Sequence, residues 1–224
     1  MLKKLDNNSS LYANAAKSFK MPTFTQIYGG GGANFAANPL LEPEEGWTYE
    51  FGYKKTSNTS MFKAALYYMD LDTIEYEGKG TSSNPYVTRN MSFKNKGLEM
   101  TYEKDFGSKY SYSLGANFCN PMGKNKKGVW ERKFAREQYN AGIKYHDAKF
   151  NAALTGMFTT DRASGWGDLL PVNFIAGYKF DKSSSVELGV ENIFDRDDIV
   201  SNPGSATKYY CLPRMVHVTY TYTF

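Results

Sequence analysis

The sequence has little of what marks several functional classes. It contains two histidines, two cysteines and three tryptophans, and no apolar run approaches the ~20 residues that a membrane helix needs. Cys119 and Cys211 have no metal-binding spacing, and only His146 and His217 could assist them. We therefore predict no metal site and no cofactor. The spacing favours two separate cysteines and leaves one long-range disulfide open.

Two further functional classes are excluded by what is missing. The net charge of +4 is small and the basic residues are scattered, so no nucleic-acid partner is expected. His217 falls in the middle of an expected strand and His146 at a turn, which gives no catalytic pair, and we predict no enzyme. Residues 1–8 hold two lysines but no apolar segment after them, so we expect no signal peptide and a truncated or internal start.

Aromatic residues, by contrast, are abundant, with 18 Tyr and 15 Phe, and many recur at every second position. In the last segment Val216, Val218 and Tyr220 alternate with polar residues, as in a half-buried β-strand. The same alternation predicts ten strands. They cover residues 11–15, 47–54, 62–69, 97–103, 110–118, 139–146, 150–159, 172–180, 186–191 and 216–224.

The charges indicate what surrounds these strands. No Asp, Glu, Lys or Arg falls on the apolar set of any segment, whereas a lipid-facing Lys or Arg would cost ~2–4 kcal/mol at the bilayer midplane. A soluble β-rich surface or adhesin domain, the competing class, would carry charges on both faces. The opposite set holds Glu50, Lys54, Lys63, Glu99, Glu103, Lys144, Lys179, Glu187 and Glu191.

Short and long connections alternate along the chain. The short links are residues 55–60, 106–109, 146–149 and 181–185, and the long ones are 22–45, 70–92, 119–137, 160–170 and 195–210. Outer-membrane barrels have short periplasmic turns and long extracellular loops. The sequence therefore predicts an all-β fold, an antiparallel transmembrane β-barrel portion of about ten strands whose partner is the lipid bilayer.

Several segments resemble, in order and spacing, those of TonB-dependent outer-membrane receptors, over essentially residues 1–224. Pro213 stands where the family has Gly before the final Arg, here Arg214. The aromatic end formed by Tyr220, Tyr222 and Phe224 resembles the family's barrel-assembly signal. The segments that carry the resemblance are Ser18-Phe-Lys-Met-Pro-Thr-Phe24, Asn38-Pro-Leu-Leu-Glu-Pro-Glu44, Glu50-Phe-Gly-Tyr-Lys54, Lys96-Gly-Leu-Glu99 and Val190-Glu-Asn-Ile-Phe-Asp195.

The resemblance implies the C-terminal portion of a receptor barrel in the outer membrane, with the plug domain and N-terminal barrel strands absent. It implies TonB-dependent uptake of a metal chelate, with the TonB system and a plug domain as partners in an intact relative. Residues 22–38 lack the histidine found there in haem receptors of the family, which favours an iron-siderophore. The candidate ligand contacts are the loop aromatics Tyr28, Phe35 and Trp130, which an interfacial aromatic girdle would explain equally well.

One rival function remains open within the membrane class. Ten is an even number of strands, so an autonomous ten-stranded barrel, acting as a small porin or an outer-membrane enzyme, is geometrically allowed. Closure of the sheet distinguishes this alternative from a receptor portion.

Overall fold

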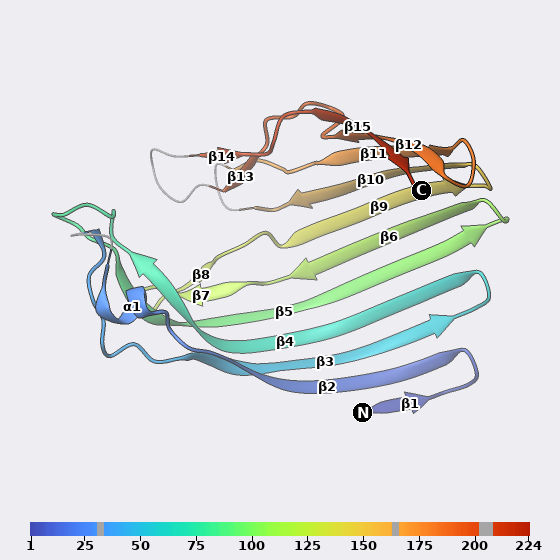
Figure 1. Ribbon diagram of the computed structural model, residues 1–224. Coiled ribbons are helices and arrows are strands. Elements are labelled where there is room, and N and C mark those ends of the chain that lie inside the picture. Colours follow the sequence, from blue (N-terminus) through green and yellow to red (C-terminus); the bar gives the residue numbers. More distant parts are fainter. Residues whose placement is uncertain (31–33, 163–165, 202–207) are drawn as a thin grey trace.

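The computed structural model describes residues 1–30, 34–162, 166–201 and 208–224. Within them the chain forms one antiparallel sheet of 13 strands and a separate pair of short strands. Ten long strands follow one another in chain order across the large sheet (Figure 1). They are β2 (Ser9–Lys20), β3 (Glu44–Thr56), β4 (Ser60–Glu77), β5 (Val87–Phe106), β6 (Tyr110–Cys119), β9 (Glu137–His146), β10 (Phe150–Thr160), β11 (Val172–Lys179), β12 (Ser184–Glu191) and β15 (Met215–Tyr222).

The shorter elements decorate one end of this sheet and one of its edges. The edge strand β1 (Leu2–Lys4) pairs with β2. Figure 1 shows the other short elements at the end where the long loops lie: α1 (Phe24–Tyr28), β7 (Met122–Lys124), β8 (Trp130–Arg132), β13 (Ile199–Ser201) and β14 (Tyr209–Tyr210). We call this end the long-loop edge and the opposite end the short-turn edge. Both names refer to the ends of the strands and not to the lateral edge strands of the sheet. In the described ranges, no helix has the length and apolar character to cross a membrane.

The structure confirms all ten predicted strands and the face assigned to each. Residues paired directly across antiparallel strands point to the same face. Phe51 pairs with Ala13 on one side and Leu66 on the other, Leu66 pairs with Leu98, and Leu98 pairs with Phe118. The same matching continues without a shift to the last strand. The ten apolar sets therefore form one continuous apolar face.

The apolar face is exposed and carries aromatic residues in two belts. Phe51 is 54% and Leu66 59% exposed, which a water-soluble sheet would not tolerate over so many strands. Between the belts lie smaller aliphatic residues such as Ala64, Leu114 and Ala141. Ring pairs near the short-turn edge are Tyr53–Phe62, Tyr102–Tyr112, Tyr110–Tyr145 and Tyr178–Phe180, and those towards the long-loop edge are Trp47–Tyr49, Phe118–Tyr139 and Tyr139–Phe158.

The polar face is built from large side chains lying over glycines. Tyr12 pairs with Gly52, and a Cβ at Gly52 would lie 2.2 Å from Tyr12 Cζ. The Tyr12 hydroxyl donates to Glu50, whose carboxylate also lies 3.9 Å from Lys63 Nζ. The Tyr67 ring lies over Gly97 and the His217 ring over Gly189 in the same way. Glycine is required at these positions because the ring occupies the space of a side chain.

The sheet is open within the described residues. β1 and β15 are its two edge strands, and the termini lie at opposite edges in Figure 1. The closed ten-stranded barrel considered above is therefore not the arrangement of this chain. A barrel wall of ten strands with free edges is complete only when further strands pair with β1 and β15.

One predicted loop is wrong. The link expected over residues 70–92 is mostly strand, because β4 and β5 have 18 and 20 residues and only residues 78–86 connect them. A membrane-spanning β-strand needs about 9–11 residues, so this hairpin projects far beyond the apolar band. Outside lipid neither face has to be apolar, so the two-residue alternation disappears although the strands continue.

Candidate functional site

The candidate site is the set of loops at the long-loop edge, and its first element is the connection between β2 and β3. Thr23 caps α1: its hydroxyl accepts from the Gln26 N–H, and the Gln26 side chain accepts from the Thr23 N–H. Gln26 is buried, and its carbonyl accepts from the Thr88 hydroxyl of β5 at 3.1 Å. The segment Ser18–Phe24 thus contains the end of β2 and the start of α1, and α1 is tied to the distant strand β5.

The segment Asn38–Glu44 is hydrogen-bonded to the projecting hairpin of β4 and β5. Asn38 Nδ2 donates to the Thr88 carbonyl at 2.7 Å. Glu42 and Asn90 exchange two hydrogen bonds of 2.9 Å, from the Glu42 N–H to Asn90 Oδ1 and from Asn90 Nδ2 to the Glu42 carbonyl. The motif therefore anchors residues 38–42 to β5.

An ionic network lies on the polar face of the projecting hairpin. Glu75 and Arg89 are directly paired, and the Arg89 guanidinium contacts Glu75 and Glu77, each at 2.5 Å. Lys133, which follows β8, reaches Glu75 at 2.7 Å. The network borders a hollow of about 460 Å³ that is also lined by Asn125, Lys126, Lys127 and Glu131. We call this hollow the ionic hollow.

The segment that lines one side of the ionic hollow is strongly basic. Residues 122–136 contain Lys124, Lys126, Lys127, Arg132, Lys133 and Arg136 against the single acidic residue Glu131. Asp161, at the end of β10, contacts Arg132 and lies 3.7 Å from Arg136. Lys126 and Lys127 remain exposed at the tip of the β7–β8 hairpin, where they give this side of the loop assembly a positive surface.

The segment Val190–Asp195 stabilises the connection between β12 and β15 through Asn192. Asn192 is buried and adopts a left-handed backbone with a φ of 48°. Its side-chain amide donates to the carbonyls of Arg196 and Leu212 and accepts from the Arg196 N–H. Arg196 also binds both oxygens of Asp198, and this hydrogen bonding holds the pKa of that carboxyl below its usual value.

The structure does not bring the three candidate ligand contacts into one cluster. Tyr28 packs on Phe24 and is 63% exposed. Phe35 lies half-buried against Tyr76 and Tyr86. Trp130 is flanked by Lys94 and Lys124, whose Nζ atoms lie 5.6 Å and 5.9 Å from the ring centroid. A ligand contact by each of the three residues stays a prediction.

Two further groups of residues named from the sequence are the C-terminal aromatic residues and the two cysteines. Tyr220 and Tyr222 are exposed on the apolar face of the last strand, and the exposed Phe224 ring that follows it contacts Tyr222; the role of all three in assembly stays a prediction. Cys119 and Cys211 are both free thiols. In the described ranges, no group of three or more His, Cys, Asp or Glu side chains is arranged to hold a metal ion.

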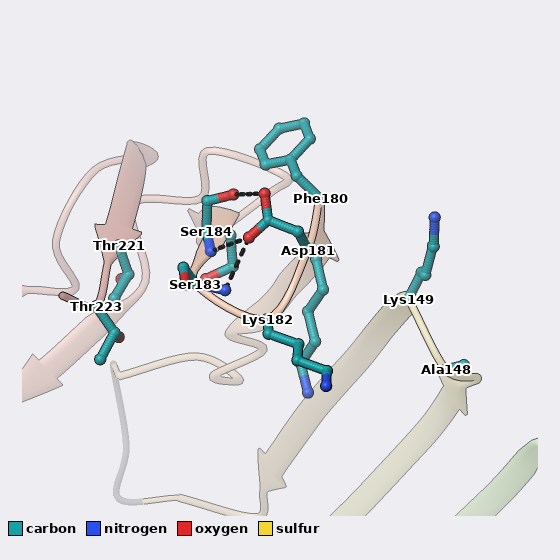
Figure 2. Close-up of a pocket in the computed structure, with 11 residues that line it drawn as sticks. Ala148, Lys149, Phe180, Asp181, Lys182, Ser183, Ser184, Thr221 and Thr223 are labelled. Carbon is teal, nitrogen blue, oxygen red and sulfur yellow. Dashed lines mark hydrogen bonds between the residues drawn. The ribbon is translucent and has the colours of Figure 1, made fainter.

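At the short-turn edge, three turns share one aspartate device. Asp6, Asp147 and Asp181 each accept from the backbone N–H groups two and three residues ahead. Figure 2 shows the third case, where Asp181 also accepts from the Ser184 hydroxyl. This turn borders a hollow of about 520 Å³. Its basic and hydroxyl lining includes Lys149, Lys179, Lys182, Thr221 and Thr223.

Sequence reasoning missed Glu75, Arg89, Lys133 and Gln26. Glu75 and Arg89 lie in the link predicted over residues 70–92, where acidic residues two positions apart, at Asp70 and Asp72 and again at Glu75 and Glu77, were the available signal for an extended strand. Gln26 sits three residues after Thr23, at the spacing of a capping box, and this spacing could have located α1.

The open antiparallel wall, with its apolar face, two aromatic belts, short turns at one end and anchored loops at the other, defines an outer-membrane β-barrel portion. Residues 2–193 match the family described as TonB dependent receptor-like, beta-barrel. The chain belongs to this family of outer-membrane receptors and transporters.

Solved structures agree with the fold. The copper transporter OprC is 13% identical with a TM-score of 0.78, and the alignment covers 100% of this chain and 39% of OprC. The ferric-catecholate import receptor Fiu of E. coli K12 is 19% identical with a TM-score of 0.72, covering 100% of this chain and 34% of Fiu.

A third solved structure is a mutant of the ferric enterobactin receptor PfeA of Pseudomonas aeruginosa in complex with enterobactin. It is 17% identical with a TM-score of 0.77, covering 100% of this chain and 40% of PfeA. The chain thus spans well under half the length of these relatives.

Proposed function

We propose that this chain forms the C-terminal barrel wall and part of the ligand-capturing loops of an outer-membrane receptor that takes up a metal chelate, with an iron-siderophore as its ligand. The TonB system drives the uptake, and a plug domain occupies the lumen that the polar face lines. The observation that carries the choice of ligand is the pair of exposed lysines beside the ionic hollow, Lys126 and Lys127, since ferric siderophores of the catecholate class are anionic.

The geometry of the loops supports capture of a ligand rather than catalysis. Lys126 and Lys127 line the ionic hollow and remain exposed, on a hairpin that the ion pair between Lys133 and Glu75 ties to β4. Fixed loops with an exposed positive surface bind an anion at low ordering cost. Of the three candidate contacts, Tyr28 has the most accessible ring and is the first to test.

The proposal is tested in the source bacterium by deleting the gene that encodes this chain and following uptake of radioactive iron bound to a catecholate siderophore. We expect uptake to be lost, restored by the wild-type gene, and reduced about tenfold by a gene carrying Lys126→Glu and Lys127→Glu. Lys149→Glu with Lys182→Glu, two exposed lysines in the turns of the short-turn edge and far from the loops, is the matched control and should restore full uptake.

Copper is the competing substrate, because one of the solved structures with this fold is a copper transporter. The deletion strain therefore also receives copper salts without a siderophore. Unchanged iron uptake together with reduced copper uptake would replace the siderophore by copper. Loss of neither would overturn the proposed receptor function.

A further inference from the structure

A cluster of Lys94, Lys124 and Trp130 lies on the apolar face, on the side opposite to the ionic hollow. Lys94 shares its face with Leu98 because the two are four residues apart in one regular strand. Lys94 pairs with Met122, and Lys124, two residues further on, pairs with Trp130. All three side chains therefore project from the face that carries only apolar residues along the ten predicted strand segments, but that beyond those segments also carries Asp70, Lys96 and Arg132. We call them the outer basic cluster.

The geometry of this cluster exposes positive charge beside an indole ring. The Nζ atoms of Lys94 and Lys124 lie 5.6 Å and 5.9 Å from the Trp130 ring centroid, within cation–π range. Trp130 is 38% exposed, so the ring is accessible as well as flanked. Asp70 lies 3.3 Å from Lys94 and offsets part of one charge. Lys96, also exposed on this face, adds another.

The height of the cluster along the strands is that of lipid headgroups. Leu98 and Met100 lie in the aliphatic band, and Lys96 pairs with Tyr68 in the neighbouring strand. Lys94 lies two residues further out, a distance of about 7 Å along a β-strand. The polar layer of a bilayer extends roughly 5–8 Å beyond the hydrocarbon core on each side. The Lys94 ammonium group therefore stands at the height of the phosphates of the outer leaflet, and Lys124, two residues further out, lies beside the same Trp130 ring.

We propose that the outer basic cluster binds the phosphate headgroup of a membrane lipid. The two ammonium groups supply charge-assisted hydrogen bonds to the phosphate, while the Trp130 ring between them positions both lysines. The other side of the same hairpin faces the ionic hollow through Glu131 and Lys133, so the hairpin joins a lipid contact on one face to the ligand-capturing loops on the other.

This inference rests on the proposed membrane insertion of the sheet and is independent of which ligand the loops capture. The test uses the protein purified from outer membranes in mild detergent, with retained lipids measured by native mass spectrometry and lipid A added as the probe. The variant is Lys94→Ser with Lys124→Ser, and the matched control is Lys126→Ser with Lys127→Ser at the tip of the same hairpin.

We expect the wild type and the tip control to retain lipid A, and the cluster variant to retain at least fivefold less. Trp130→Phe should keep most of the retention and Trp130→Ala should lose it. Equal retention by the cluster variant would overturn the proposal. Displacement of the lipid by inorganic phosphate alone would also overturn it, because the site would then bind a free anion. Iron uptake in the same strains reports the receptor function separately.

Discussion

Asp195 and Arg214 are joined by two contacts across the connection between the last two long strands. The Arg214 backbone N–H donates to Asp195 Oδ1 at 2.8 Å, and the Arg214 guanidinium lies 3.7 Å from Asp195 Oδ2. Asp195 ends the segment Val190–Asp195, and Arg214 is the arginine that follows Pro213. Asp195 and Arg214 are far apart in the sequence, and their contacts therefore join the two ends of the connection between β12 and β15.

Asn192 lies at the centre of that closure, and its replacement should loosen the whole connection. Asn192→Ala removes the amide that satisfies the carbonyls of Arg196 and Leu212, which costs about 2 kcal/mol and raises local opening ~30-fold. Limited proteolysis with mass spectrometry should then show faster cleavage in residues 193–201 and 208–214. Asn192→Gly keeps the left-handed backbone but loses the same bonds, so it should be cleaved nearly as fast.

Asn58→Ala, at an exposed turn of the opposite edge, is the control and should match the wild type. Wild-type cleavage of Asn192→Gly would mean that only the backbone conformation matters at this position, and the account of the amide would be wrong.

The contact of Tyr12 with Gly52 should be measurable as a coupling energy. Gly52→Ala places a Cβ against the Tyr12 ring and should destabilise the sheet by about 1–3 kcal/mol. In the double variant with Tyr12→Ala the obstacle is gone, so most of this cost should disappear. Urea unfolding of the protein in detergent, followed by intrinsic fluorescence, gives the four free energies of the cycle.

Gly115→Ala provides the matched glycine control on the same polar face. A Cβ there would meet Asn140 Nδ2 at 3.4 Å, an ordinary contact, so this variant should lose little stability. Additive effects of Gly52→Ala and Tyr12→Ala would contradict a direct contact between ring and glycine.

The strands could be predicted from sequence because lipid on one side imposes an apolar residue at every second position, whatever the rest of the chain does. The prediction failed where that constraint ends, in the outer parts of β4 and β5 at residues 70–77 and 87–92. There Asp70 and Asp72 occupy positions on the face that is apolar further down the strand, so the alternation is lost. Only pairing with β5 shows that the backbone is extended.

The candidate site was harder to predict because its contacts join residues far apart in the chain. Asn38 meets Thr88 and Glu42 meets Asn90, at separations of 50 and 48 residues that depend on the register of the intervening strands. The sequence identified the motifs but not their partners. It placed Trp130 in a loop, and only the pairing of β5, β7 and β8 shows which face of the sheet the ring lies on.

The aspartate turns should make the short-turn edge sensitive to acid. Hydrogen bonds from the Phe150 N–H, the Tyr145 hydroxyl and the Lys149 N–H lower the pKa of Asp147 to about 2, and similar bonds, led by the Ser184 hydroxyl, lower the pKa of Asp181. Because the folded pKa lies below the unfolded value of about 3.9, the stabilisation is complete above that value and is lost as the pH falls towards 2.

Hydrogen exchange of residues 146–150, measured between pH 5 and pH 2 and corrected for the intrinsic rate, should therefore show protection that falls in acid. Asp147→Asn keeps an acceptor oxygen without a titrating charge, and its protection should change much less with pH. An equally steep fall in Asp147→Asn would assign the acid sensitivity to other groups.

Neighbouring positions on β12 offer the sharpest test of which face meets lipid. Leu188 pairs with Ala176 and Val218 on the apolar face, whereas Glu187, one residue earlier, lies on the polar face. Leu188→Lys should cost ~2–4 kcal/mol in the bilayer and greatly reduce the amount of heat-modifiable protein in outer-membrane fractions. Glu187→Lys changes the charge by more but stays within about 0.5 kcal/mol of the wild type, because its side chain remains in water. Equal loss with both substitutions would mean that the two faces meet the same environment, and the membrane-spanning wall would have to be abandoned.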